Sequence, residues 1–134
     1  GRLKQNQPAQ WKRTNGSGLL TAFLPIGTVY VTRVSATFRP HDSLLWRRKG
    51  KDVRFAAAFL PLGKGESGEL RIESVPVRDA AGVEVDLRAA QAVRVRRGDR
   101  KLTVLVNYSG RRLAAGPVSS GKRVALHIAA ADRP

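Results

Sequence analysis

The chain contains no cysteine and no methionine, and only 2 of its 134 residues are histidine. Without cysteine it can form neither a disulfide framework nor a thiolate metal site. Cysteine usage therefore does not indicate the cellular compartment of the protein. Two histidines are too few for a histidine-rich metal cluster. Because even an initiator methionine is missing, we expect the chain to be a trimmed piece of a longer protein, from which a signal peptide or neighbouring domains have been removed.

Long apolar runs are missing as well. No segment approaches the ~20 apolar residues that a membrane helix needs, so we expect no membrane insertion. Hydrophobic residues still make up 42% of the chain, which is enough for a folded core, and 134 residues fit one domain. We assign residues 1–17 to a polar N-terminal arm or edge strand, 18–130 to the domain and 131–134 to a tail.

Acidic residues are scarce, because 25 Lys and Arg against 10 Asp and Glu give a net charge of +15. The excess is uneven: residues 1–65 carry +10, residues 66–87 carry −4 and residues 88–134 carry +9. A basic surface interrupted by one acidic stretch indicates a polyanionic partner or an acidic neighbouring domain. A solvated surface from an Arg-rich proteome is the alternative, because net charge alone does not fix function.

A seven-residue phrase occurs twice, as TAFLPIG at 21–27 and AAFLPLG at 57–63, with 5 of 7 positions identical. Each copy is typical of a buried strand that ends at a Pro-x-Gly corner, so we expect Phe23 and Phe59 to be buried. The copies are either two core strands with similar exits or a pair of neighbouring, pseudo-equivalent strands. One repeat is too few for a solenoid.

Alternating apolar and polar residues predict further strands between turn signals. We expect Val124, Leu126 and Ile128 to face inward, Gly98-Asp99 to form a two-residue hairpin turn, and residues 39–43 to form a loop. The whole pattern predicts an all-β fold, a two-sheet antiparallel β-sandwich of about eight or nine strands, with a β-barrel as the runner-up. The strands are expected near residues 18–24, 28–38, 53–60, 69–75, 83–87, 93–96, 102–108, 118–121 and 123–128.

Two dense groups of cations flank predicted hairpin turns, and each has an aromatic residue beside it. Arginine grips carboxylate or sulfate bidentately and an aromatic ring stacks on a sugar, although the same combination suits single-stranded nucleic acid. Trp46 and Tyr108 as core residues are the alternative. The predicted ligand-binding residues are Trp46, Arg47, Arg48, Lys49, Lys51 and Arg54 in the first group, and Arg94, Arg96, Arg97, Arg100, Lys101 and Tyr108 in the second.

No pattern predicts a catalytic, cofactor or metal site. The glycines of residues 63–68 match a dinucleotide-binding turn, but the residues that follow have strand rather than helix periodicity. His41 and Asp42 are adjacent in the sequence, which rarely lets one orient the other as a catalytic base. The carboxylates of residues 66–86 alternate with apolar positions, as solvent-facing strand residues do, so they offer no inward acid–base pair.

One family resembles this chain. VRFAAAFLP at 53–61 looks like the strand-then-proline phrase in the C-terminal β-sandwich of heparinase II/III-type polysaccharide lyases, and GKRVAL at 121–126 is similar to its closing strand. The resemblance covers about residues 18–130. It implies an accessory domain of a secreted or periplasmic bacterial enzyme acting on acidic polysaccharide, while a cytoplasmic location stays open. Those lyases keep their catalytic Tyr and His largely in an α-helical toroid, which this chain lacks.

We therefore expect a non-catalytic β-sandwich module that binds an acidic polysaccharide through Arg/Lys-rich hairpins, with no cofactor. Two alternatives stay open: a single-stranded nucleic-acid-binding protein, and a structural module that docks on an acidic partner protein. The Ala-, Arg- and Gly-rich composition is itself typical of a high-GC bacterium.

Overall fold

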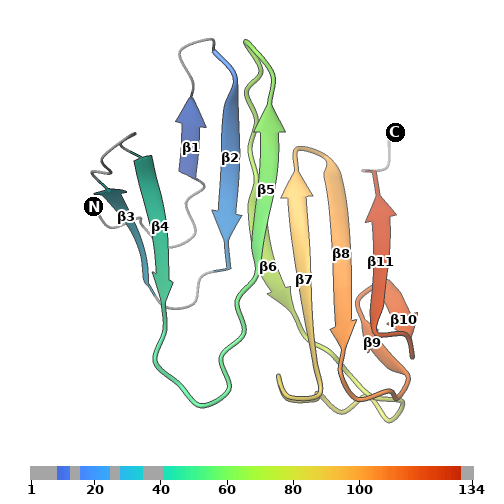
Figure 1. Ribbon diagram of the computed structural model, residues 1–134. Helices are drawn as coiled ribbons and strands as arrows, with labels where there is room; N and C mark the ends of the chain where they lie inside the picture. The colour runs from blue at the N-terminus through green and yellow to red at the C-terminus, as the bar shows by residue number, and fades with distance from the viewer. Residues whose placement is uncertain (1–8, 13–15, 25–27, 35–40, 131–134) are drawn as a thin grey trace.

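The computed structural model describes residues 9–12, 16–24, 28–34 and 41–130, which form an all-β structure without a helix (Figure 1). The predicted all-β, sandwich-like class is confirmed, and the sheets do not close into a barrel. The strands of the described residues are β1 (Ala9–Lys12), β2 (Gly18–Phe23), β3 (Thr28–Val34), β4 (His41–Arg47), β5 (Ala57–Leu62), β6 (Arg71–Val75), β7 (Ala90–Arg97), β8 (Arg100–Asn107), β9 (Leu113–Ala115), β10 (Val118–Ser120) and β11 (Val124–Ala129).

The strands form four antiparallel sheets in the described part of the chain. The largest has the order β11-β8-β7-β6, and a three-stranded sheet has the order β1-β2-β5. Two hairpins, β3–β4 and β9–β10, form the two-stranded sheets. Figure 1 shows the β9–β10 hairpin beside β11.

The repeated phrase forms two neighbouring strands, which confirms the second interpretation of the repeat. β2 and β5 pair antiparallel, with Ala22 directly opposite Ala58, its equivalent in the other copy. Pro61 lies inside β5 rather than beyond its end, opposite Leu19. The position is tolerated because β5 is an edge strand, where a missing N–H interrupts no second ladder. Residues 25–27, which carry the first Pro-x-Gly, lie outside the described residues.

The three-stranded sheet packs on one face of the four-stranded sheet. Leu20 and Ala22 of β2 and Leu62 of β5 form one buried cluster with Leu70 and Ile72, which lie just before and within β6. Burying each of the larger aliphatic side chains contributes about 1.5–3 kcal/mol. The cluster therefore joins the two sheets, and it covers the β6 and β7 side of the larger one.

The β9–β10 hairpin covers part of the opposite face. Leu113 and Val118 from the hairpin share a buried cluster with Ala92 and Leu105 of the four-stranded sheet. Leu105 is 0% exposed and lies in β8, one of the two central strands. The four-stranded sheet is thus covered on both faces, by a different small layer on each.

The outer strand β11 presents the opposite face from the one expected. Val124, Leu126 and Ile128 are 55%, 60% and 70% exposed, so the prediction that they face inward is wrong. Ala125 of the same strand packs against the core cluster beneath β9–β10 instead. The alternation of the strand was correct, but neither small layer reaches over its apolar side.

Phe59 is also misassigned by the sequence, because it is 60% exposed. Phe23 is half-buried, and its ring contacts that of Trp46 with the centroids 5.3 Å apart. The buried side chains of β5 are on the other side of that strand, where Leu62 is 4% exposed. The repeat therefore conserves strand pairing but not burial of the phenylalanine.

Several strand boundaries differ from those expected. Residues 41–43 belong to β4 rather than to a loop, and the strand expected at 53–60 begins at Ala57. Residues 83–87 form no strand and make only the isolated bridge between Arg78 and Glu84. The reason is local: the Asp79 carboxylate accepts hydrogen bonds from the Ala81 and Val83 N–H groups, which competes with ladder formation. The short strands β1 and β9 account for part of the excess over the expected count.

The contrast between Leu105 and Phe59 gives a test of this packing. Leu105→Ala should lower the free energy of unfolding by about 2–5 kcal/mol, because it empties a fully enclosed site. Phe59→Ala should cost less than about 1 kcal/mol, because most of its side chain is already in water. Urea denaturation of the two variants measures both values. Equal losses would contradict the described position of β5.

A buried asparagine ties together the loops beneath β8. Asn107 is 3% exposed, and its amide donates hydrogen bonds to the Arg111 carbonyl at 2.7 Å and the Ser120 carbonyl at 3.4 Å. Its oxygen accepts hydrogen bonds from the backbone N–H and the hydroxyl of Ser109. One side chain therefore connects the end of β8, the following turn and the end of β10.

Asn107→Asp should be destabilising at pH 7 by about 1–3 kcal/mol, because a carboxylate would face two carbonyl oxygens with no proton to donate. Such a carboxyl has a pKa raised in the folded state. The loss relative to the parent protein is therefore full above the folded-state pKa and shrinks as the pH falls through it. Urea denaturation of both proteins at pH 7 and pH 4 measures this difference. A loss independent of pH would contradict the assigned contacts.

Candidate functional site

The β7–β8 hairpin carries the second predicted cationic group, and its turn is the one expected. Arg97 pairs with Arg100 across Gly98 and Asp99, and Gly98 has a φ of 56°. A two-residue hairpin turn needs such positive φ values, which glycine adopts without strain. The turn fixes the register of the two strands and hence which cations share a face.

Strand register brings cations from three strands into one row. Arg71 of β6 is opposite Arg96 of β7, which in turn is opposite Lys101 of β8. Arg94 lies two residues from Arg96 on the same side of β7. We call the surface formed by Arg71, Arg94, Arg96 and Lys101 the cationic face; it belongs to the same side of the sheet as the β9–β10 layer.

Arg71 was missing from the predicted site. Its sequence signal was present, because it alternates with Leu70 and Ile72, which are 3% and 9% exposed. That alternation predicts an exposed side chain but gives no information on the neighbouring strand. Only the pairing of β6 with β7 adds Arg71 to the group.

Glu73 neutralises part of the cationic face. One of its carboxylate oxygens accepts hydrogen bonds from Arg94 at 3.3 Å and from Arg96 at 2.9 Å. Arg71 pairs with Glu69. All these side chains are 27–71% exposed, so each pair contributes only about 0–1 kcal/mol to stability. These acidic side chains therefore reduce the mutual repulsion of the cations without cancelling it.

The hairpin turn adds two more cations beside the 68–69 segment. Arg97 and Arg100 are exposed and line a hollow of about 370 Å³ with Gly68 and Glu69. A neighbouring hollow of about 260 Å³ is lined by Glu69, Arg71, Arg96 and Gly98. Both hollows are open to solvent, so the turn and the cationic face form one accessible basic surface.

The first predicted cationic group does not form a hairpin. Arg47 ends β4, which pairs with β3, whereas the next strand, β5, pairs with β2. Residues 48–56 are therefore a long connection between two sheets, which Figure 1 shows running below the strands. Arg48, Lys49 and Lys51 are exposed along it, and the prediction of a hairpin tip is wrong.

Arg54 and Tyr108, one residue from each predicted group, contact each other. The Arg54 guanidinium carbon lies 5.1 Å from the centre of the Tyr108 ring, a cation–π contact that contributes about 0.5–1 kcal/mol at an exposed site. The buried Arg54 Nε has no hydrogen-bond partner among the described residues. The contact holds the 48–56 connection near the end of β8, and it occupies one face of the Tyr108 ring.

The two cationic groups lie at opposite ends of the four-stranded sheet. Asp52, within the first group, lines the same hollow as Ala90 at the start of β7, whereas Arg97 ends that strand. At about 3.3 Å per residue the two ends of β7 are roughly 23 Å apart. The predicted twelve-residue site is therefore two separate surfaces.

Trp46 lies between two other aromatic side chains. Its ring centre is 5.3 Å from that of Phe23 and 4.6 Å from that of Phe55, and both contacts are edge-on. It also packs against the cluster beneath the three-stranded sheet. These are the contacts of a core aromatic, the alternative considered from the sequence, and a role in stacking on a ligand stays a prediction.

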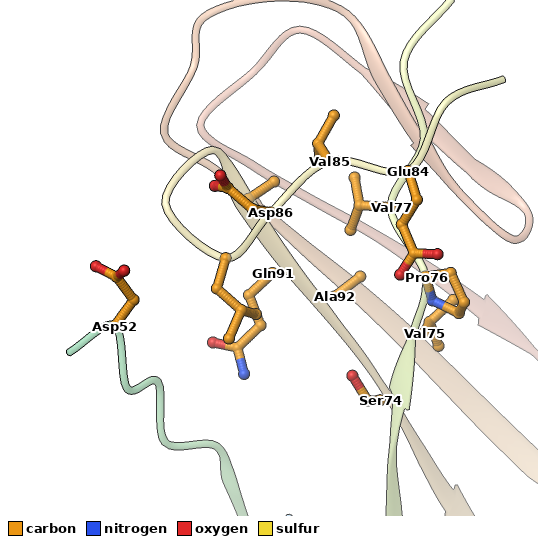
Figure 2. A pocket seen from close by; sticks show the side chains of 12 residues that line it. Asp52, Ser74, Val75, Pro76, Val77, Glu84, Val85, Asp86, Gln91 and Ala92 are labelled. Atoms are coloured by element: carbon orange, nitrogen blue, oxygen red, sulfur yellow. The ribbon is translucent and has the colours of Figure 1, made fainter. Parts of the chain in front are cut away.

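An acidic hollow lies at the end of the sheet opposite the β7–β8 turn. It has a volume of about 450 Å³, with Val75, Val77 and Ala92 among its apolar lining residues. Figure 2 shows Asp52 and Glu84 on opposite sides of it, with Asp86 between them. Its charge is opposite to that of the cationic face, so it does not extend that surface.

One carboxylate of this hollow, that of Asp86, has structural partners. Asp86 accepts hydrogen bonds from the backbone N–H groups of Arg88 and Ala89 and pairs with the Arg88 guanidinium at 3.1 Å. The Arg88 guanidinium, helped by these N–H groups, holds the pKa of Asp86 below its ordinary value. Asp86 is thus ionised at neutral pH and caps a turn. Within the described residues no three acidic, histidine or cysteine side chains are grouped to hold a metal.

The two histidines belong to different strands, β11 and β4. His127 is exposed and shares a cross-strand row with Thr103, Arg94 and Glu73. His41 begins β4, and its side chain lies outside the described residues. Across the described residues no helix is long and apolar enough to cross a membrane.

Comparison of the chain with protein-family models, with curated proteins and with solved structures finds no match. The resemblance to the sandwich domain of heparinase II/III-type lyases therefore stays a prediction.

Proposed function

We propose that this chain is a non-catalytic β-sandwich module that binds an acidic polysaccharide through the cationic face and the β7–β8 turn. The observation that carries the proposal is the cross-strand row of Arg71, Arg96 and Lys101. Paired strands hold the three backbone positions in place, which lowers the entropic cost of gripping a repeating anion. Guanidinium groups bind carboxylate and sulfate bidentately.

The charge of this surface supports the same proposal. It contains six cationic side chains and three acidic ones, which leaves a net charge of +3. Directly opposite residues on paired strands are about 5 Å apart, within the Debye length of about 8 Å at physiological salt, so neighbouring charges act together on a polyanion. The cations are Arg71, Arg94, Arg96, Arg97, Arg100 and Lys101, and the acids are Glu69, Glu73 and Asp99.

Polysaccharide is favoured over nucleic acid by the composition of the face. None of β6, β7, β8 and β11 contains Phe, Trp or Tyr, so the only ring that these four strands offer for stacking of bases is the small imidazole of His127. Stacking on aromatic side chains contributes about 1–3 kcal/mol per base in single-strand binding. Carboxylate or sulfate groups spaced along a sugar chain need only the cations.

The resemblance to lyase sandwich domains supports a parent protein of that kind. We propose that the chain is an accessory domain of a bacterial polysaccharide lyase, secreted or periplasmic, which it would hold on its substrate. The chemistry would then belong to another domain.

Titration with heparin, alginate and a mixed-sequence single-stranded oligonucleotide at several salt concentrations tests the proposal. Binding of both polysaccharides should weaken as salt rises. Arg96→Glu should weaken it at least about tenfold, because it reverses a charge at the centre of the row. Arg48→Glu makes the same charge change in the 48–56 connection and should cost less than about threefold.

Equal losses in the two variants, or no polysaccharide binding at low salt, would show the proposal to be wrong. Tighter, salt-resistant binding of the oligonucleotide would instead favour a nucleic-acid-binding protein.

Glu73→Gln should tighten polysaccharide binding by about two- to fivefold, because it removes the negative charge that both Arg94 and Arg96 contact. Glu84→Gln makes the same change of charge near the opposite end of the sheet and should leave affinity within about twofold. Fluorescence anisotropy with labelled heparin measures both. Weaker binding by Glu73→Gln would mean that the carboxylate positions the two guanidinium groups for the ligand.

A further inference from the structure

In the part of the chain that the structure describes, the outer strand β11 is an open edge with an apolar surface. Asn107 N–H donates to the Arg123 carbonyl at 2.8 Å, which places residues 107 and 123 in a hydrogen-bonded position of the β8–β11 ladder. Such positions alternate along an antiparallel pair. The backbone groups of Ala125, His127 and Ala129 therefore point to β8, whereas those of Val124, Leu126 and Ile128 point away from the sheet.

The same three residues carry the exposed apolar side chains. We call Val124, Leu126 and Ile128, which are 55–70% exposed, the apolar stripe. Each is directly opposite a half-buried aliphatic residue of β8, namely Val106, Val104 and Leu102. The stripe is thus the margin of a continuous apolar surface, and contiguous patches of this kind mark interaction sites.

The edge strands β5 and β6 have features that discourage pairing, and β11 has none of them. β5 contains Pro61, and β6 carries the exposed charges of Arg71 and Glu73. Proline and charge are the usual protection of exposed edge strands. β11 has neither a proline nor an Asp, Glu, Lys or Arg in its six residues.

Cations border both ends of this open edge. Lys122 and Arg123 come just before β11, and Lys101 is opposite Ala129 at its other end; all three are exposed. Residues 100–130 contain six Lys and Arg and no Asp or Glu. A second copy of this chain would bring the same positive borders together, and each copy carries a net charge of +15.

We infer that β11 binds an extended segment of another protein, with aliphatic residues at alternate positions and acidic residues at both ends. The segment adds a strand to the sheet through the outward N–H and C=O groups of Val124, Leu126 and Ile128. Its aliphatic side chains extend the apolar stripe, and its acidic ends face Lys122, Arg123 and Lys101. This surface shares Lys101 with the cationic face but does not depend on polysaccharide binding.

Two synthetic peptides test the inference on the full chain. Both contain the sequence of β11 itself, VALHIA; one has two glutamates at each end and the other has two lysines. By fluorescence anisotropy at low salt the glutamate peptide should bind at least about tenfold more tightly than the lysine peptide. In hydrogen exchange it should protect the amides of Val124, Leu126 and Ile128.

Matched variants locate the site. Leu126→Lys should weaken binding of the glutamate peptide at least about tenfold, whereas His127→Lys adds the same charge on the other face of the strand and should change it less than about threefold. Equal effects of the two variants would overturn the inference, as would failure of the glutamate peptide to bind. Equal binding of both peptides, or a dimer in sedimentation with these amides already protected, would instead identify a second copy as the occupant.

Discussion

The β6–β7–β8–β11 sheet has two apolar regions to cover, and two small layers cover them unequally. The β2–β5 pair packs over β6 and β7 on one face, and the β9–β10 hairpin packs over the opposite face around Leu105. Neither layer spans the whole sheet. What they leave exposed is the cationic face near the β7–β8 turn and the apolar stripe of β11.

This division explains why the exposed surfaces have opposite characters. Strand alternation sends Arg94 and Arg96 to one side of β7 and Val93 and Val95 to the other, where they pack against the β2–β5 layer. The same alternation in β11 places its aliphatic residues on the β2–β5 side, but beyond the reach of that layer. The β7–β8 register, fixed by the turn at Gly98, therefore places Arg96 opposite Lys101, and the β8–β11 register sets the position of the apolar stripe.

The sequence predicted much of the fold, because alternation and turn residues are local signals. The all-β class, the Gly98-Asp99 turn and the pairing of the repeated phrase as neighbours were all accessible in this way. Alternation shows which residues share a face, but the direction in which that face points depends on the layer above it. Phe59 and the apolar stripe were placed inside for this reason.

The candidate site was predictable only in part, for a related reason. Arg94, Arg96 and Lys101 share a face because they belong to one hairpin, which the sequence revealed. The contribution of Arg71 and the partial neutralisation by Glu73 depend on the pairing of β6 with β7, a contact between segments more than twenty residues apart. The cations of residues 48–54 were predicted to belong to the same site because their composition is similar. In the structure the length of a strand separates the two groups.

A polyanion that contacts the β7–β8 hairpin and its neighbour β6 would be located by residue-resolved NMR during titration with a short heparin fragment. The amide signals of Arg71 and of residues 94–101, with the guanidinium signals of Arg94 and Arg96, should shift progressively and saturate together. Signals of residues 48–54 and of the apolar stripe should stay in place. Shifts confined to residues 48–54 and Tyr108, with the hairpin unaffected, would show that the polyanion does not bind the cationic face.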